Sequence, residues 1–121
     1  MRKTKILIVE DELIFAHEME LWLKDAGYEI VGITSQGSKA LDWAVSFKPD
    51  IVIMDVQLKG RIDGIQAALQ MKEKIDINVI FLTGNPDLHN TLKQTSLKPV
   101  SIITKPVSQY KLLDILKSVK K

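Results

Sequence analysis

The sequence contains no cysteine among its 121 residues. Disulfide scaffolds, thiolate zinc sites, iron–sulfur clusters and thiol nucleophiles are therefore excluded. No apolar run is long enough to span a membrane, and the basic start is followed by too short an apolar stretch for a signal peptide. These absences favour a cytoplasmic protein that does not bind membranes.

An excess of charge of one sign is also missing. The sequence has 17 Lys and Arg residues and 15 Asp and Glu residues, a net charge of +2. This balance is too even to indicate nucleic acid binding. Apolar residues make up 45% and charged residues 26%, which is ordinary globular usage and argues against disorder. At this length we expect a single domain over residues 1–121 with its own core.

Short apolar runs, rich in β-branched residues, recur along the chain at residues 6–9, 30–33, 51–54, 79–82 and 100–103. They are nearly unbroken rather than alternating, a pattern typical of strands that are covered on both faces of a parallel sheet. Amphipathic helical patterns lie between and after them. The weakest, at residues 87–96, predicts only a short helix that ends early.

Five strands alternating with five helices predict an α/β fold. We expect a (βα)5, flavodoxin-like fold of three layers, because right-handed crossovers place helices on both faces of a doubly wound parallel sheet. One of the two common strand orders for such a sheet is 2-1-3-4-5, and ligands bind beyond the carboxyl ends of its strands.

Polar residues follow the runs that would become strands one, three, four and five: Glu10 and Asp11, Asp55, Thr83, and Lys105. In the expected order these strand ends are neighbours, so the side chains should gather at one rim of the sheet. Crowded carboxylates repel one another, and oxygen ligands without paired His point to Mg²⁺ or Mn²⁺. Asp55 could act as a nucleophile toward phosphorus, with Thr83 and Lys105 binding the phosphoryl oxygens.

The ordered set of motifs resembles the receiver domain of two-component response regulators. The matching segments are KILIVEDE at 5–12, PDIVIMD at 49–55, DG at 63–64, FLTG at 81–84 and ITKP at 103–106. The resemblance covers essentially the whole chain. It implies a signalling switch rather than an enzyme, apart from the part that the domain takes in its own phosphorylation and dephosphorylation.

The resemblance also implies residue roles. Asp55 would accept a phosphoryl group from a sensor histidine kinase or a phosphotransfer domain, and Thr83 and Lys105 would contact that group. Asp11, Asp55 and the main-chain carbonyl of Gln57 would bind Mg²⁺, with Glu10 holding a metal-bound water. The bond between Lys105 and the following proline would be cis.

The partners follow from the same resemblance. Phosphorylation would shift the surface formed by the fourth and fifth strands and helices, which would regulate a downstream partner or an output domain. We expect no direct binding of nucleic acid by this domain. The resemblance leaves open whether the chain pairs with a second copy and whether it stands alone or is a domain of a larger protein.

Three departures from the family pattern stand out. The loop at residues 55–64 is one residue longer than usual and carries Gly60, which could take a positive φ. Ile102 replaces the usual switch aromatic, so output would depend on the loop after the fourth strand and on the weak helix. Pro99 should push Lys98 toward extended geometry.

The sequence is compatible with two rival functions. A phosphatase-type hydrolase similar to the haloacid-dehalogenase-like enzymes would use Asp55 as its nucleophile, but such enzymes carry a second Asp two residues on, where this chain has Gln57. A degenerate receiver would bind partners without phosphate. The intact Asp11, Asp55, Thr83 and Lys105 argue against it.

Overall fold

The computed structural model describes residues 2–60 and 62–119. In that part of the chain the strands are β1 (Lys5–Val9), β2 (Glu29–Thr34), β3 (Ile51–Asp55), β4 (Asn78–Thr83) and β5 (Ser101–Thr104). The helices are α1 (Leu13–Asp25), α2 (Gly37–Phe47), α3 (Gly64–Lys74), α4 (Leu88–Lys93) and α5 (Gln109–Lys117). None of these helices is long and apolar enough to cross a membrane.

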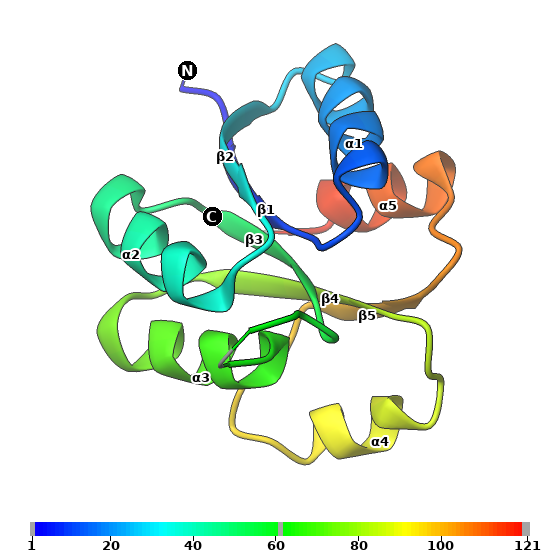
Figure 1. The fold of residues 1–121 in the computed structure, drawn as a ribbon. Coiled ribbons are helices and arrows are strands. Elements are labelled where there is room, and N and C mark those ends of the chain that lie inside the picture. The colour runs from blue at the N-terminus through cyan, green and yellow to red at the C-terminus, as the bar shows by residue number, and fades with distance from the viewer. Residues whose placement is uncertain (1, 61, 120–121) are drawn as a thin grey trace.

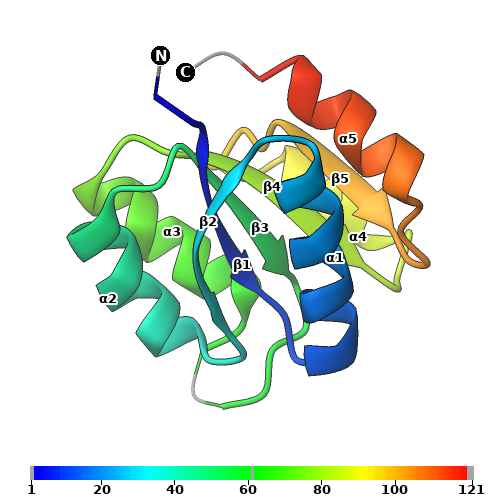
Figure 2. The same ribbon diagram turned by 90° about the horizontal axis from the view of Figure 1, so that it is seen from above.

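The strands form one parallel sheet in the order β2-β1-β3-β4-β5, as the sequence predicts. Helices α1 and α5 cover one face, while α2, α3 and α4 lie on the other (Figure 1). Figure 2 shows β1 and β3 running in the same direction, toward the end of the sheet at which α1 begins. The three-layer, doubly wound flavodoxin-like fold is therefore confirmed.

Two apolar clusters, one on each face of the sheet, form the core. Along β1, Leu7 and Val9 pack toward α2 and α3, whereas Ile6 and Ile8 pack toward α1 and α5. All four side chains are fully buried, so each removes its whole apolar surface from water at a gain of about 1.5–3 kcal/mol. Burial on both faces is the physical reason that the apolar runs are unbroken rather than alternating.

Local signals fix where the helices begin and end. Gly27 takes a φ of 95° just past the end of α1, where a left-handed residue closes the last turn. Asp63 caps α3 by accepting a hydrogen bond from the Gln66 N–H, and the Gln66 side chain accepts one from the Asp63 N–H. Ser108 caps α5 through the Lys111 N–H. Side-chain caps therefore set the starts of α3 and α5, the helices that follow β3 and β5.

The connection from α4 to β5 differs from expectation. The helix ends early, as predicted, but Lys98 adopts a left-handed φ of 46° instead of extended geometry before Pro99. Leu97 is buried in the core, and the Val100 N–H donates to the Val79 oxygen at 2.9 Å. The chain must turn between these two anchors, and this tertiary constraint overrides the local preference set by the proline.

Gly64 allows α3 to start directly against the end of β3. A Cβ at this position would overlap the main-chain oxygen of Asp55. We therefore expect Gly64→Ala to lower the free energy of unfolding by about 1–3 kcal/mol, the usual range for overpacking, in urea denaturation. The control is Gly84→Ala, because no heavy atom lies within 4 Å of a Cβ there. Equal effects of the two substitutions would contradict this packing argument.

Candidate functional site

The register of the sheet brings the two acidic strand ends together. Strands β1 and β3 pair up to Val9 and Met54. The next residues, Glu10 and Asp55, therefore lie side by side at the rim. Both are buried, with 0% and 4% of their surface exposed. Two adjacent carboxylates that are shielded from water require a compensating charge or a proton.

Strand β5 supplies that charge. Strands β4 and β5 pair through Thr83 and Thr104, and the N–H of the next residue, Lys105, donates to the Thr83 oxygen at 2.8 Å. The Lys105–Pro106 peptide bond is cis, as the family resemblance implies. Lys105 is thereby held at the same rim as the two carboxylates.

The Lys105 ammonium group is the centre of the site. Its Nζ lies 2.9 Å from Glu10 Oε1 and 3.2 Å from Asp55 Oδ2. On its outer side are Glu12, whose Oε1 is 3.9 Å away, and the ring of Phe15, whose centroid is 5.9 Å away. Lys105 therefore forms a compact ion cluster with two buried carboxylates, bordered by the start of α1.

Main-chain groups orient the two carboxylates. The Gln57 N–H donates to Asp55 Oδ1 at 3.0 Å, and the Glu12 N–H donates to Glu10 Oε2 at 3.0 Å. Each carboxylate thus has one oxygen on a backbone N–H and the other beside Lys105. Because a carboxylate oxygen offers two lone pairs, Asp55 retains the capacity to bind a further ligand.

Burial changes the acid–base behaviour of this cluster. It raises the pKa of the Glu10 carboxyl to about 7, although the Glu12 N–H and the Lys105 ammonium group act to lower it. Burial also works to lower the pKa of Lys105, but the charges of Glu10 and Asp55 outweigh it and the net direction is upward. The ammonium form of Lys105 is therefore the stable one at the rim.

Thr83 lies at the rim but is engaged elsewhere. Its side chain is fully buried, and its Oγ1 accepts from the Asn85 N–H at 3.0 Å while lying 3.3 Å from the Asn85 oxygen, to which it donates. No hydrogen bond joins this hydroxyl to Asp55 or Lys105 among the residues described. The expected contact of Thr83 with a phosphoryl group stays a prediction.

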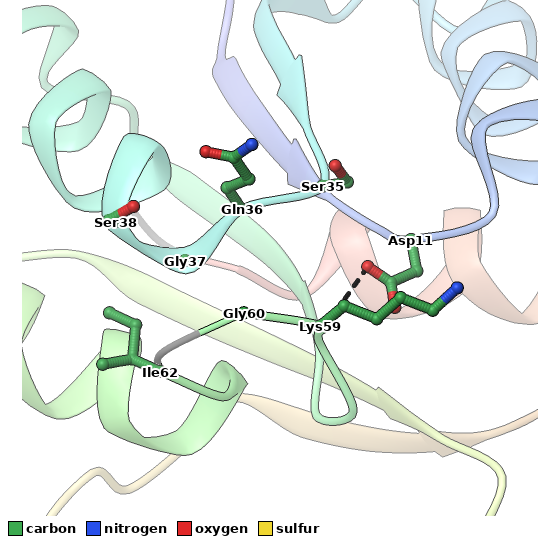
Figure 3. Close-up of a pocket in the computed structure, with 8 residues that line it drawn as sticks. All are labelled: Asp11, Ser35, Gln36, Gly37, Ser38, Lys59, Gly60 and Ile62. Carbon is green, nitrogen blue, oxygen red and sulfur yellow. Dashed lines mark hydrogen bonds between the residues drawn. The ribbon is translucent and has the colours of Figure 1, made fainter.

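Asp11 points toward Lys59, in the loop after β3 (Figure 3). Its Oδ1 accepts a long hydrogen bond of 3.5 Å from the Lys59 N–H, in the long loop after β3. Gly60 in that loop has a φ of 108°, as expected. Asp11 also borders a hollow of about 560 Å³ between this loop and the start of α2.

The metal ligands implied by the resemblance are only partly assembled. In residues 2–60 and 62–119, no three acidic, His or Cys side chains converge closely enough to hold a metal ion. Magnesium, however, takes one or two carboxylates and completes its octahedron with carbonyl and water oxygens. Asp11, Asp55 and the carbonyl of Gln57 supply oxygen donors of that kind, so the residue set fits Mg²⁺. In the conformation described, Asp55 is paired with Lys105 instead.

Sequence reasoning located the rim but missed some of its contacts. Glu12 and Phe15 beside Lys105 were not singled out as site residues, and neither was the hold of Asn85 on Thr83. The positions of Glu12 and Asn85 carry a usable signal, because each lies two or three residues after the end of a strand, whereas Phe15 lies within α1. Side-chain direction, which decides the contact, does not follow from that position.

Comparison with known proteins identifies the family. The family described as "Response regulator receiver domain" matches residues 6–117, and the chain belongs to it. It is 40% identical over 80 residues to the transcriptional regulatory protein PdtaR of Mycobacterium tuberculosis, in both strain CDC 1551 / Oshkosh and strain H37Rv. That alignment covers 66% of this chain and 38% of PdtaR, so the chain matches well under half of the relative's length.

Solved structures share the fold closely. The signal receiver domain of a modulated diguanylate cyclase from Desulfovibrio desulfuricans G20 is 27% identical, with a TM-score of 0.86 over 96% of this chain and 92% of that one. The response regulator domain of Thermotoga maritima CheB is 23% identical, with a TM-score of 0.84 over 99% of this chain and 100% of that one, and shows the fold alone. Receiver domains of two-component systems are in general signalling switches rather than enzymes.

The raised pKa of Glu10 predicts how the free energy of unfolding changes with pH. Between the ordinary value of 4.5 and about 7, the folded chain keeps a proton that the unfolded chain releases. The free energy of unfolding of the native chain should therefore fall, relative to that of Glu10→Gln, by about 3 kcal/mol from pH 4.5 to pH 8. Urea denaturation in metal-free buffer measures this, with Glu12→Gln as the control for an exposed charge beside Lys105. A difference that is the same at every pH would contradict the expected profile.

Proposed function

We propose that this chain is a phosphorylation-dependent switch in which Asp55 is the phosphoacceptor. The observation that supports this most strongly is the buried Asp55 carboxylate, held by the Gln57 N–H on one oxygen with the Lys105 ammonium group 3.2 Å from the other. A histidine kinase or a phosphotransfer domain donates the phosphoryl group. An Asp55 oxygen attacks the phosphorus atom, the bond from phosphorus to the donor imidazole nitrogen breaks, and an acyl phosphate results.

The residues around Asp55 fit a reaction that depends on positioning and charge neutralisation. The Gln57 N–H fixes the carboxylate, which limits the rotations available to the nucleophile. Lys105 already faces Asp55, so its ammonium group neutralises charge on the incoming phosphoryl oxygens without a large rearrangement. Thr83 joins them once its hydroxyl leaves Asn85.

We assign the metal ligands to Asp11, Asp55 and the Gln57 carbonyl, with Glu10 acting through a bound water. Mg²⁺, or Mn²⁺ in its place, would supply further positive charge to the phosphoryl oxygens. Asp11 faces the loop after β3, so turning its carboxylate toward Asp55 is the change that completes this set.

The acquired negative charge acts on the surface formed by β4, α4, β5 and α5. Lys105 and Thr83 sit at the ends of β5 and β4, so their response to the phosphoryl group is passed directly to those elements. The mycobacterial relative is named a transcriptional regulatory protein. That name supports control of an output function, through a partner protein or a domain of the same protein.

Labelling by acetyl phosphate with Mg²⁺ tests the role of Asp55. Intact-mass measurement should show one added phosphoryl group on the native chain and none on Asp55→Asn. The control is Asp42→Asn, which removes an exposed carboxylate from α2 and should label like the native chain. Labelling of Asp55→Asn, or none of the native chain, would sink the proposal. Steady turnover of p-nitrophenyl phosphate would favour the phosphatase instead.

Thermal unfolding tests the metal site. An ion that binds only the folded chain raises the melting temperature by mass action, and Mg²⁺ at ten times its Kd should add about 3–6 °C. Asp11→Asn should lose most of this increase, because it removes a ligand without disturbing the contacts of Asp55. The Asp42→Asn chain should keep it. A native melting curve that Mg²⁺ leaves unchanged would count against the site.

A further inference from the structure

Helix α4 is weakly anchored. It has only six residues, too few to be stable alone, and Asp87 provides no side-chain cap. Of its side chains only Leu92 is fully buried. Figure 1 shows α4 at the edge of the molecule, between its connections to β4 and β5. Its position therefore depends on a small number of tertiary contacts.

One of those contacts is polar and reaches the strand that carries Lys105. His89 Nε2 lies 3.0 Å from Thr104 Oγ1, a hydrogen-bonding distance, and both side chains are half-buried. It is the only side-chain hydrogen bond between α4 and β5 among the residues that the structure describes. Thr104 immediately precedes Lys105 and pairs with Thr83 across the sheet.

A second route joins the same two places through the loop after β4. Thr83 Oγ1 holds the Asn85 main chain, and Asn85 Oδ1 accepts from the Asp87 N–H at 3.0 Å. The Leu88 N–H then donates to the Asn85 oxygen at 3.2 Å, which starts α4. Thr83 thus connects to α4 along this loop, and α4 connects back to Thr83 through the hydrogen bond between His89 and Thr104.

The contacts form a closed ring, and this has a mechanical consequence. If Thr83 releases Asn85, the loop that starts α4 changes, while Thr104 stays fixed in the sheet. The bond between His89 and Thr104 is then the contact of the ring that still opposes a movement of α4 away from β5. The His89 ring borders a hollow of about 380 Å³, also lined by Lys93 and Lys98, so there is room for it to move.

From this ring we infer that the hydrogen bond between His89 and Thr104 is a latch that holds α4 against β5 until Asp55 is phosphorylated. The inference rests on the proposed function, because phosphorylation is what draws the Thr83 hydroxyl away from Asn85. His89 is a positioning residue here. It touches no reacting atom and acts by stabilising the unphosphorylated arrangement of α4.

Beryllofluoride with Mg²⁺, a mimic of the phosphoryl group, provides the test. Thr104→Val removes the hydroxyl while keeping the shape of a strand residue, and Thr104→Ser keeps the hydroxyl as the matched control. Removing the latch should make beryllofluoride bind about three- to tenfold more tightly to Thr104→Val than to the native chain, the range that one net hydrogen bond allows. Thr104→Ser should bind like the native chain.

Amide hydrogen exchange of α4 is the second readout. Without beryllofluoride, residues 88–93 should exchange faster in Thr104→Val than in Thr104→Ser or the native chain, with the core strands unchanged. Equal affinities and equal exchange in all three chains would overturn the latch and leave the proposed function standing. Failure of the native chain to bind beryllofluoride would overturn the proposed function, and the latch with it. A general loss of protection in Thr104→Val would also overturn the latch, because it would show a structural role only.

Discussion

The contact between the Lys105 ammonium group and the buried carboxylates of Glu10 and Asp55 is the constraint on which the rest of the structure depends. Two carboxylates with almost no exposed surface are unfavourable unless a positive charge or a proton accompanies them. Lys105 can reach both only if β1, β3 and β5 end at the same rim. The strand order and the register that put it there are therefore linked to the chemistry, and the apolar layers on both faces supply the free energy that keeps the charges buried.

The fold could be predicted from the sequence because its signals are local and consistent. Unbroken apolar runs indicated strands covered on both faces, and the positions of Glu10, Asp55 and Lys105 after such runs indicated one rim. The features that could not be predicted from the sequence are those set by contacts between segments far apart in the chain. Lys98 turns because Leu97 and Val100 are anchored on either side of it, which no local preference reveals. The roles expected from the family resemblance stay predictions, since geometry alone does not test them.

The same contact explains why the expected metal ligands are not gathered. Lys105 occupies the Asp55 oxygen that faces the centre of the rim, at 3.2 Å, and Asp11 is drawn toward the Lys59 N–H instead. A divalent cation would bind the same carboxylates as the Lys105 ammonium group. Its binding therefore requires Asp55 to divide its contacts between the cation and Lys105. The raised pKa of Glu10 also indicates that the negative charge at the rim is not fully balanced, because Lys105 and the backbone compensate this carboxylate only in part.

The chain has Ile102 where an aromatic residue is usual, and its helix α4 is held by few contacts. Ile102 packs against the core cluster on the side of α2 and α3, so it has no ring whose rotation could report on Thr83. A two-state element can still be built from weak contacts, provided that its two arrangements differ by only a few kcal/mol. Helix α4, with one buried leucine and one side-chain hydrogen bond to β5, is held by weak contacts of this kind. Helix α4 buries a single side chain, whereas α1 and α3 each bury several, so α4 is the helix with the fewest core contacts to hold it in place.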